Sequence, residues 1–308
     1  MNTSNGKIFS VRMFVFAGMV ALLVPGLGMG KALEETGVGA GARSLAIGEG
    51  GAAALSGAES LYWNPAGILG GQGPEFILGH TAWVEDLSTE AGAAVVPFGS
   101  LGSMGVCASW QTYSGIEERD SLGNLVKTYN LTTGSGSVAW AYPFMKRYSA
   151  GISAGFLVQN GVKVNETGIP LGLGVRAEFG DIAVGLSGQD LLSSRPACNV
   201  STSYRMIPGG YGLFLSGGAI IREMEMRIGA GAELAVVRMV KVRLGYQVPL
   251  EKTHLGGFSN LTAGFGLVYR AFGLDYAFLP LGDIGQVHRI QLTYRLGEGS
   301  ATETAKQQ

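Results

Sequence analysis

From residue 74 onward, hydrophobic and polar side chains alternate repeatedly along the chain. Between residues 240 and 244, for example, Val240, Val242 and Leu244 alternate with Lys241 and Arg243. Successive side chains of a β-strand point to opposite sides of its sheet. Each such segment therefore has one apolar face and one face of glycine, serine and charge, which is the pattern of a strand. The strands predicted in this way are 74–84, 88–98, 102–112, 133–143, 147–159, 170–179, 181–190, 199–207, 209–221, 224–235, 239–249, 259–270, 272–280 and 286–296.

The predicted connections differ in length between the two ends of these strands. At one end they are tight turns, whereas at the other end most are sizeable loops, namely 113–132, 160–169, 191–198 and 250–258. Outer-membrane barrels have short periplasmic turns and longer external loops. The alternation therefore predicts that the short turns, and both ends of the strand array, face the periplasm.

A sandwich of two sheets would also have one apolar face per strand, turned toward its core. A closed barrel is favoured because the polar faces are rich in glycine, and because aromatic residues recur near strand ends, as in membrane barrels. These residues are Trp83, Phe98, Trp110, Tyr142, Phe144, Tyr148, Tyr269 and Phe272. A closed barrel also satisfies every backbone polar group within lipid. The predicted fold class is an all-β, 14-stranded antiparallel transmembrane β-barrel with an N-terminal plug, or hatch.

The N-terminus has the layout of a secretory signal peptide. Lys7 and Arg12 precede an apolar run over 13–27, and small residues follow up to Ala32. This run is short for a spanning helix, which needs about 20 residues, although an uncleaved anchor is the alternative. The chain is divided accordingly into a signal peptide at 1–32, a plug at 33–72, a barrel at 73–297 and a polar tail at 298–308.

The composition agrees with export into a membrane. Only 15% of residues are charged, against about 25% in ordinary globular domains, and the chain contains 51 glycines. The net charge of −1 indicates no nucleic-acid partner. Cys107 and Cys198 are too few for a disulfide framework. Two unpaired thiols are favoured over a bridge formed after export.

Two N-terminal blocks carry a resemblance to a known family. Residues 42–48 read Ala-Arg-Ser-Leu-Ala-Ile-Gly, and residues 62–67 read Tyr-Trp-Asn-Pro-Ala-Gly. These blocks, together with 274–278, 282–285 and 288–290, resemble the PorV/PorQ family, which is related to FadL-type long-chain fatty acid transporters. The resemblance implies outer-membrane residence and a 14-stranded barrel whose N-terminus folds into the lumen. It also implies a plug motif formed by Asn64, Pro65 and Ala66.

Two features depart from that family. Related barrels end on an aromatic residue that assists assembly, whereas the last predicted strand ends here at Leu296. The predicted lumenal face is also rich in charges of both signs, at Arg176, Glu178, Arg205, Glu225, Arg227, Glu233, Lys241, Arg243, Asp275, Arg289 and Arg295. One interpretation is mutual pairing across strands and with Arg43 and Glu49 of the plug. The other is a polar permeation path or binding site.

Enzymatic chemistry finds little support in the sequence. The three histidines, His80, His254 and His288, lack metal-ligand spacing, and no serine elbow or H-E-x-x-H motif appears. The glycines near residue 40 lack the G-x-G-x-x-G spacing of a nucleotide-binding loop. The sequence therefore predicts neither an enzyme nor a cofactor.

Three functions are consistent with these observations. The chain could transport a hydrophobic small molecule past the plug, with residues 61–69 moving. It could instead bind a secreted cargo protein through loops 113–132 and 250–258, since the resemblance implies a role in type IX secretion. A structural membrane protein is the third reading. The expected partners are outer-membrane lipid and either a hydrophobic ligand or secreted cargo.

Overall fold

The computed structural model describes residues 41–297, except 72, 85, 162–164, 194–195, 207–211, 223–224 and 251–258. The predicted signal peptide, the C-terminal tail and residues 33–40 of the predicted plug lie outside the described residues. His254 and most of the predicted loop 250–258 lie outside them too.

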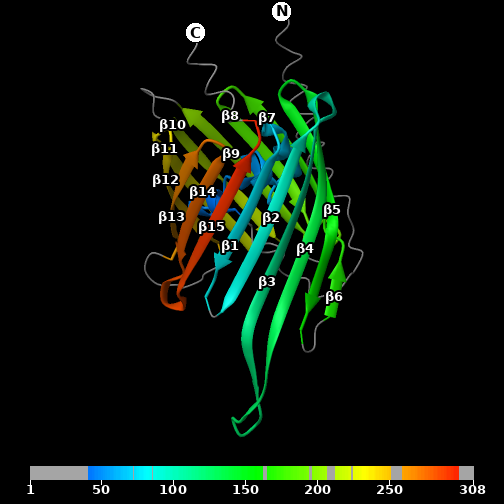
Figure 1. Ribbon diagram of the computed structural model, residues 1–308, viewed down its shortest axis with the longest axis vertical. Coiled ribbons are helices and arrows are strands. Elements are labelled where there is room, and N and C mark those ends of the chain that lie inside the picture. Colours follow the sequence, from blue (N-terminus) through cyan, green and yellow to red (C-terminus); the bar gives the residue numbers. More distant parts are fainter. Residues whose placement is uncertain are drawn as a thin grey trace, which may run out of the picture.

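The strands form one antiparallel sheet that closes on itself (Figure 1). Neighbours along the chain are neighbours in the sheet, and β1 pairs with β15 to close it. The strands are β1 (Glu75–Ala82), β2 (Leu87–Pro97), β3 (Ser103–Arg119), β4 (Leu125–Met145), β5 (Tyr148–Asn160), β6 (Asn165–Gly168), β7 (Leu171–Phe179), β8 (Ile182–Gln189), β9 (Ala197–Met206), β10 (Gly212–Arg222), β11 (Glu225–Val237), β12 (Val240–Pro249), β13 (Leu261–Tyr269), β14 (Phe272–Pro280) and β15 (Gln286–Arg295). Short 3₁₀ turns η4 (Gly99–Leu101) and η6 (Gly282–Ile284) join β2 to β3 and β14 to β15.

The fifteen strand segments make a barrel of fourteen strands. Both β6 and β7 pair with β5, along successive parts of its length. They are separated only by Ile169 and Pro170, and proline cannot donate a ladder hydrogen bond. They therefore act as one interrupted strand, and the predicted closed barrel of fourteen antiparallel strands is confirmed.

Most strand bounds fall within a few residues of the prediction, and β14 coincides with it. The prediction of a loop over 113–132 was wrong, because β3 and β4 continue past the barrel as one hairpin (Figure 1). The two strands stay paired along the hairpin as far as Arg119 and Leu125, and Ile116 lies opposite Tyr129. Residues 165–168, predicted as loop, form β6, and Cys198 lies in β9 rather than in a loop. Both cysteines are free thiols.

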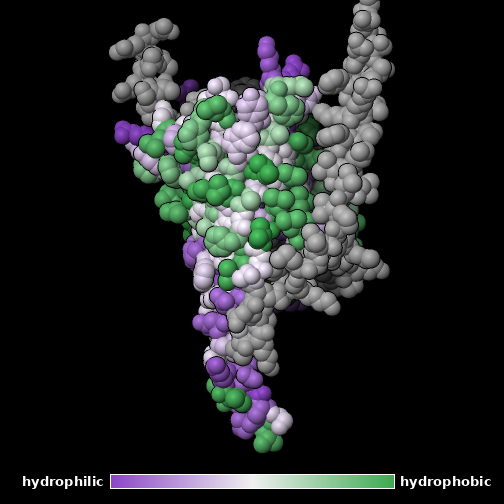
Figure 2. Space-filling view, turned by 90° about the vertical axis from the view of Figure 1, so that its right-hand side faces the viewer, coloured by the Kyte–Doolittle hydropathy of each residue, from purple (hydrophilic) through white to green (hydrophobic). Residues whose placement is uncertain are grey.

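The outer surface of the barrel is apolar. Large hydrophobic side chains that alternate along the strands are exposed, including Leu78, Val106, Val138, Leu244 and Phe265. In Figure 2 hydrophobic residues form a band across the barrel wall, while hydrophilic residues gather on the projecting hairpin. No helix within the described part of the chain is long and apolar enough to cross a membrane.

Residues 41–71, called the plug segment below, pass through the inside of the barrel. They form α2 (Ala42–Ala46), η1 (Ala52–Ala54), η2 (Ala58–Tyr62) and η3 (Pro65–Gly70). Residues 52–62 form two separate 3₁₀ helices rather than one helix, because Leu55 is extended and Gly57 adopts φ 93°. Each of its helices contacts its own part of the wall. Helix α2 contacts β12–β15, η1 contacts β8 and β9, η2 contacts β1–β3, and η3 contacts β4, β5 and β7. The segment therefore touches the wall on all sides.

Three apolar clusters hold the plug segment to the inner wall. The largest joins Leu61 and Ile68 to small and branched residues of β1, β2 and β4. A second joins Leu45 to Leu279 and Val287, and a third joins Ile47 and Leu55 to Phe214 on β10. Burial of these side chains stabilises the seated plug, at about 25 cal/mol for each Å² of apolar surface removed from water.

Candidate functional site

The predicted plug motif Asn64-Pro65-Ala66 joins three parts of the structure. The Asn64 side chain accepts a hydrogen bond from the Ala66 amide at 3.0 Å and thereby caps η3, with Pro65 in the first helical turn. Its Nδ2 donates to the Ala53 carbonyl at 2.9 Å and to the Val175 carbonyl of β7 at 3.1 Å. Proline is well suited to this first turn, where no intrahelical donor is needed. The motif therefore anchors η1 and η3 to the wall.

Glycines of the inner wall allow this close approach. A Cβ on Gly174 of β7 would lie 1.9 Å from Asn64 Oδ1, and one on Gly151 of β5 would lie 2.4 Å from the Ala66 amide nitrogen. A Cβ on Gly229 would meet the Gly48 carbonyl oxygen at 1.9 Å. The glycine-rich polar faces seen in the sequence thus provide room for the plug backbone.

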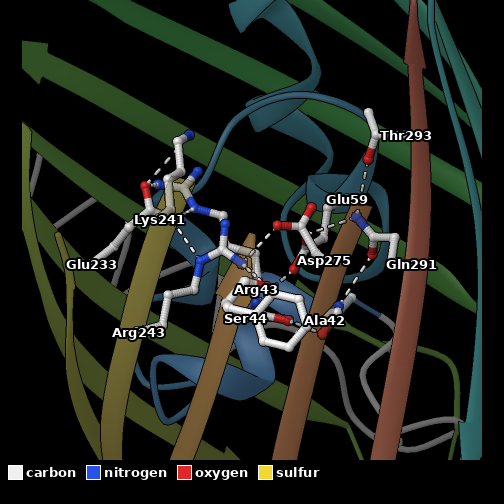
Figure 3. A network of polar contacts seen from close by, with 12 residues as sticks. Ala42, Arg43, Ser44, Glu59, Glu233, Lys241, Arg243, Asp275, Gln291 and Thr293 are labelled. Carbon is white, nitrogen blue, oxygen red and sulfur yellow. Dashed lines mark hydrogen bonds and ion pairs between the residues drawn. The ribbon is translucent and has the colours of Figure 1, made fainter. Parts of the chain in front are cut away.

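A charged cluster links α2 to the inner face of β11–β14 (Figure 3). Arg43 donates from Nε and Nη2 to the two oxygens of Glu233, at 2.9 and 3.2 Å. The same carboxylate accepts from Arg243 Nε at 2.7 Å and lies 3.7 Å from Lys241 Nζ. Arg243 also donates to Asp275 Oδ1 at 2.6 Å. Three cations therefore converge on Glu233, and the cluster joins the plug to β11, β12 and β14 through charge-assisted hydrogen bonds.

Glu59 forms a second, fully enclosed polar centre within the plug segment. Its Oε1 accepts from the Ser44 amide at 2.7 Å, and its Oε2 lies 3.4 Å from Gln291 Nε2 of β15. Gln291 in turn accepts from the Ala42 amide at 3.1 Å. Burial raises the pKa of Glu59 above its ordinary value, although the hydrogen bonds with Ser44 act in the opposite direction. Glu59 therefore links η2 to α2 at an energetic cost when it is charged.

Glu49 and Arg289 form a third contact between plug and wall. Glu49 Oε2 lies 3.3 Å from Arg227 of β11, and its Oε1 lies 3.8 Å from Arg289 of β15. Arg289 is buried and also donates to Thr81 Oγ1 at 2.8 Å and to the Gly41 carbonyl at 3.0 Å. The pairing that the sequence suggested for Arg43 and Glu49 is thus present.

The remaining predicted lumenal charges lie toward the rims. Arg176 donates to the Ala54 carbonyl at 3.1 Å and also pairs with Glu178, whose side chain is largely exposed. Arg295 lies 3.6 Å from Glu75 across the β1–β15 seam. Arg205 and Glu225 are exposed. These residues are not brought into the central cluster.

Some polar residues for which the sequence predicted no role also position the plug. Tyr62 donates to the Gly92 carbonyl at 2.6 Å and lies 3.3 Å from the Ala108 carbonyl oxygen, and burial raises the pKa of its phenol. Ser187 donates to the Trp63 carbonyl at 2.6 Å. Because Ser187 and Gln291 are neutral residues on otherwise ordinary strands, only their inward register would have indicated this role.

The polar contacts inside the barrel hold the plug segment to the wall. Among the described residues, no group of three His, Cys, Asp or Glu side chains could hold a metal ion. His80 and His288 point outward on β1 and β15, where His80 contacts Glu90 and His288 contacts the Tyr276 hydroxyl. What converges inside the barrel is a set of contacts that fixes the plug segment in place.

Several solved outer-membrane proteins have a similar architecture. The toluene transporter TbuX of Ralstonia pickettii aligns with a TM-score of 0.60 and 16% identity, over 83% of this chain and 98% of that one. The toluene transporter TodX of Pseudomonas putida aligns with a TM-score of 0.60 and 10% identity, over 84% and 99%. A FadL homologue of Pseudomonas aeruginosa gives 0.52 and 10%, over 82% and 98%. The barrel has a FadL-like fold. No family model and no curated protein sequence matches the chain.

Proposed function

We propose that this protein is an outer-membrane barrel that admits a hydrophobic small molecule when its plug segment rearranges. The observation that carries the proposal is the way the plug is held. Its principal polar anchors are side-chain ion pairs and hydrogen bonds with the wall, centred on Glu233 and Asn64, rather than continuous backbone pairing with a strand. Such contacts are individually modest, so a local rearrangement can break some of them while the barrel stays closed.

The fold supports the same proposal. Two proteins of similar architecture are toluene transporters, and the apolar outer band agrees with residence in an outer membrane. We also propose that the protein belongs to the PorV/PorQ family, because residues 42–48 and 62–67 resemble that family. Export by an N-terminal signal peptide, and the periplasmic position of the short turns, belong to the same proposal.

Uptake of a radiolabelled monoaromatic hydrocarbon by cells that express the protein tests this function. Wild-type cells should take up the probe faster than cells without the gene. Arg43→Met, which frees α2 from Glu233, should raise the rate further because the plug opens more often. Arg119→Met is the matched control, since Arg119 contacts Glu117 on the exposed hairpin, remote from the plug. Uptake equal to that of the empty strain, with the barrel assembled in the outer membrane, would refute transport of this probe class.

A specific observation also favours a second function, the binding of secreted cargo. The β3–β4 hairpin projects beyond the rim of the barrel (Figure 1) and exposes Leu122, Leu125 and Val126. Its outer strand edges have no strand partner over residues 115–119 of β3 and 125–131 of β4, among the pairings of the described strands. Unpaired edges can accept an extended segment of another protein.

Shortening the hairpin separates the two functions. A variant that joins Thr112 to Thr132 through a two-residue turn keeps the paired part of β3 and β4 within the barrel. If the hairpin binds cargo, this variant should leave secreted proteins in the periplasm while hydrocarbon uptake persists. Unchanged secretion would exclude the hairpin as a cargo site.

A further inference from the structure

A hollow of about 750 Å³ opens on the outer wall of the barrel, over β1–β5 and β15. This wall faces the viewer in Figure 1. The hollow follows from one row of cross-strand neighbours, in which Leu78, Gly92, Ala108, Gly136 and Phe156 lie side by side. Residues in such a row point to the same face of the sheet. The Phe156 ring covers Gly136, where an added Cβ would meet Phe156 Cε1 at 2.8 Å. The depression therefore lies over Gly92 and Ala108, between Leu78 and Phe156.

The next row of side chains, toward the end of the barrel from which the β3–β4 hairpin projects, closes the hollow with polar and aromatic groups. It contains His80, Glu90 and Trp110, which are register partners on β1, β2 and β3. His80 Nδ1 and Glu90 Oε1 are 2.6 Å apart, and the two side chains are 51% and 60% exposed. The other large side chains that turn outward around the hollow are apolar, namely Leu78, Trp110, Phe156, Val158, Ile290 and Leu292.

A carboxylate in this position is costly unless it has a partner. Ionisable side chains on the lipid-facing surface of a barrel destabilise it by an amount that grows with depth. Among the described residues, the one polar partner of Glu90 is His80, which contacts Oε1. Oε2 is left to accept a donor from outside the chain. A primary ammonium group satisfies that oxygen best, because it supplies both a positive charge and several N–H donors.

We propose that this hollow binds an outer-membrane lipid with an amine-bearing head. The ammonium group contacts the Glu90 carboxylate beside His80, and the acyl chain lies over Gly92 and Ala108 between Leu78 and Phe156. The site is separate from the plug, since its side chains point away from the lumen. The inference rests on the proposed membrane location and is independent of what crosses the barrel.

Native mass spectrometry of the full-length protein, delipidated in detergent, tests the site directly. The probes are phosphatidylethanolamine and phosphatidylcholine with identical acyl chains, because the choline head has no N–H donor. The wild-type protein should bind the ethanolamine lipid about tenfold more tightly, the factor expected for one hydrogen bond between charged groups. Equal affinity for the two lipids would overturn the proposal.

Two variants separate the head-group contact from the groove. Glu90→Gln should lower the affinity for phosphatidylethanolamine to that for phosphatidylcholine and leave the latter unchanged. Ala108→Leu should fill the hollow and weaken binding of both lipids. Ala230→Leu is its matched control, because Ala230 is an exposed, outward-facing alanine of β11 on another part of the wall. If Ala108→Leu binds both lipids as Ala230→Leu does, the hollow is not the site.

The same variants keep this proposal distinct from transport. Heat-modifiable gel mobility reports that each barrel is assembled. Since the side chains of Glu90, Ala108 and Ala230 all point away from the lumen, hydrocarbon uptake should remain at the wild-type level in assembled variants. A Glu90→Gln variant that loses the lipid preference but keeps normal uptake would show that the hollow binds lipid independently of transport. A wild-type protein with the lipid preference but without uptake would refute only the proposed transport.

Discussion

The Arg43 guanidinium on α2 spans both oxygens of the Glu233 carboxylate on β11, although 190 residues separate the two in the chain. The pair joins the plug segment to the barrel at a point where Arg243 and Lys241 already face the same carboxylate. Glu233 therefore compensates the charges of three cations, whereas Arg43 is only one of those three. Replacing Glu233 and replacing Arg43 should therefore have unequal effects on stability.

Glu233→Gln should destabilise the barrel more than Arg43→Met does. Removing the carboxylate leaves Arg43 and Lys241 without it and leaves Arg243 with Asp275 alone, and breaking a buried pair in this way costs about 3–5 kcal/mol. Removing Arg43 leaves Glu233 paired, and the loss is about 1–3 kcal/mol. Urea unfolding in lipid vesicles measures both values. Glu178→Gln, at the exposed rim, is the control. An equal loss for Glu233→Gln and Arg43→Met would mean that the cluster is not organised around Glu233.

Gly174→Ala should unseat the plug motif. The added Cβ would lie 1.9 Å from Asn64 Oδ1, so η3 must move, at a cost of about 1–3 kcal/mol for an overpacked site. Gly217→Ala is the matched control, because its Cβ would point outward and meet its nearest atom at 3.5 Å. Protease cleavage within residues 55–70 reports displacement of the plug. Equal protection of both variants would show that the wall accommodates the methyl group.

The strands were predictable because membrane and lumen impose opposite polarity on alternate side chains. Residues 272–280 illustrate this, since Phe272, Leu274 and Tyr276 face outward while Asp275 faces inward. Beyond the rim no lipid faces the chain, so this alternation ends. The hairpin of β3 and β4 was consequently predicted as a loop.

The site was predictable only in part. Inward register identified Glu233 and Arg243 as lumenal candidates, but the choice of partner depends on how far α2 penetrates the barrel, which period-two patterning does not encode. Tyr62 and Gln291 carried no signal of their own. Likewise, the hollow beside Glu90 lies over Gly92 and Ala108, and only the pairing register of β1–β5 places these two small residues between Leu78 and Phe156.

Asp120 should stabilise the folded conformation of the hairpin tip. Its Oδ1 accepts from the Leu122 and Asn124 amides, each at 2.9 Å, and its Oδ2 accepts from Asn124 Nδ2 at 3.0 Å. The Asn124 side chain and amide lower the pKa of Asp120 below its usual value. The stabilisation is therefore present above the unfolded value of 3.8 and disappears as the pH falls through the lower folded value.

Amide hydrogen exchange at Leu122 and Asn124 measures this effect. Asp120→Ala should exchange faster at both amides at neutral pH, whereas Glu118→Ala should exchange as the wild type does. In the wild type, protection should be constant above the unfolded pKa and decrease only in stronger acid. Protection that is insensitive to Asp120→Ala would show that strand pairing alone orders the tip.

Glu59 gives the opposite pH dependence inside the barrel. Burial raises its pKa above the ordinary value of 4.5, so the folded protein binds the proton more tightly than the unfolded chain does. The stability associated with protonated Glu59 is complete below 4.5 and is lost as the pH rises through the folded pKa. Glu59→Gln stays neutral throughout and retains an oxygen that can accept from the Ser44 amide. The free energy of unfolding of the wild type, measured relative to Glu59→Gln, should therefore decrease from pH 4.5 upward and then become constant. A difference that is independent of pH in that range would show that water or a movement of α2 already solvates the carboxylate.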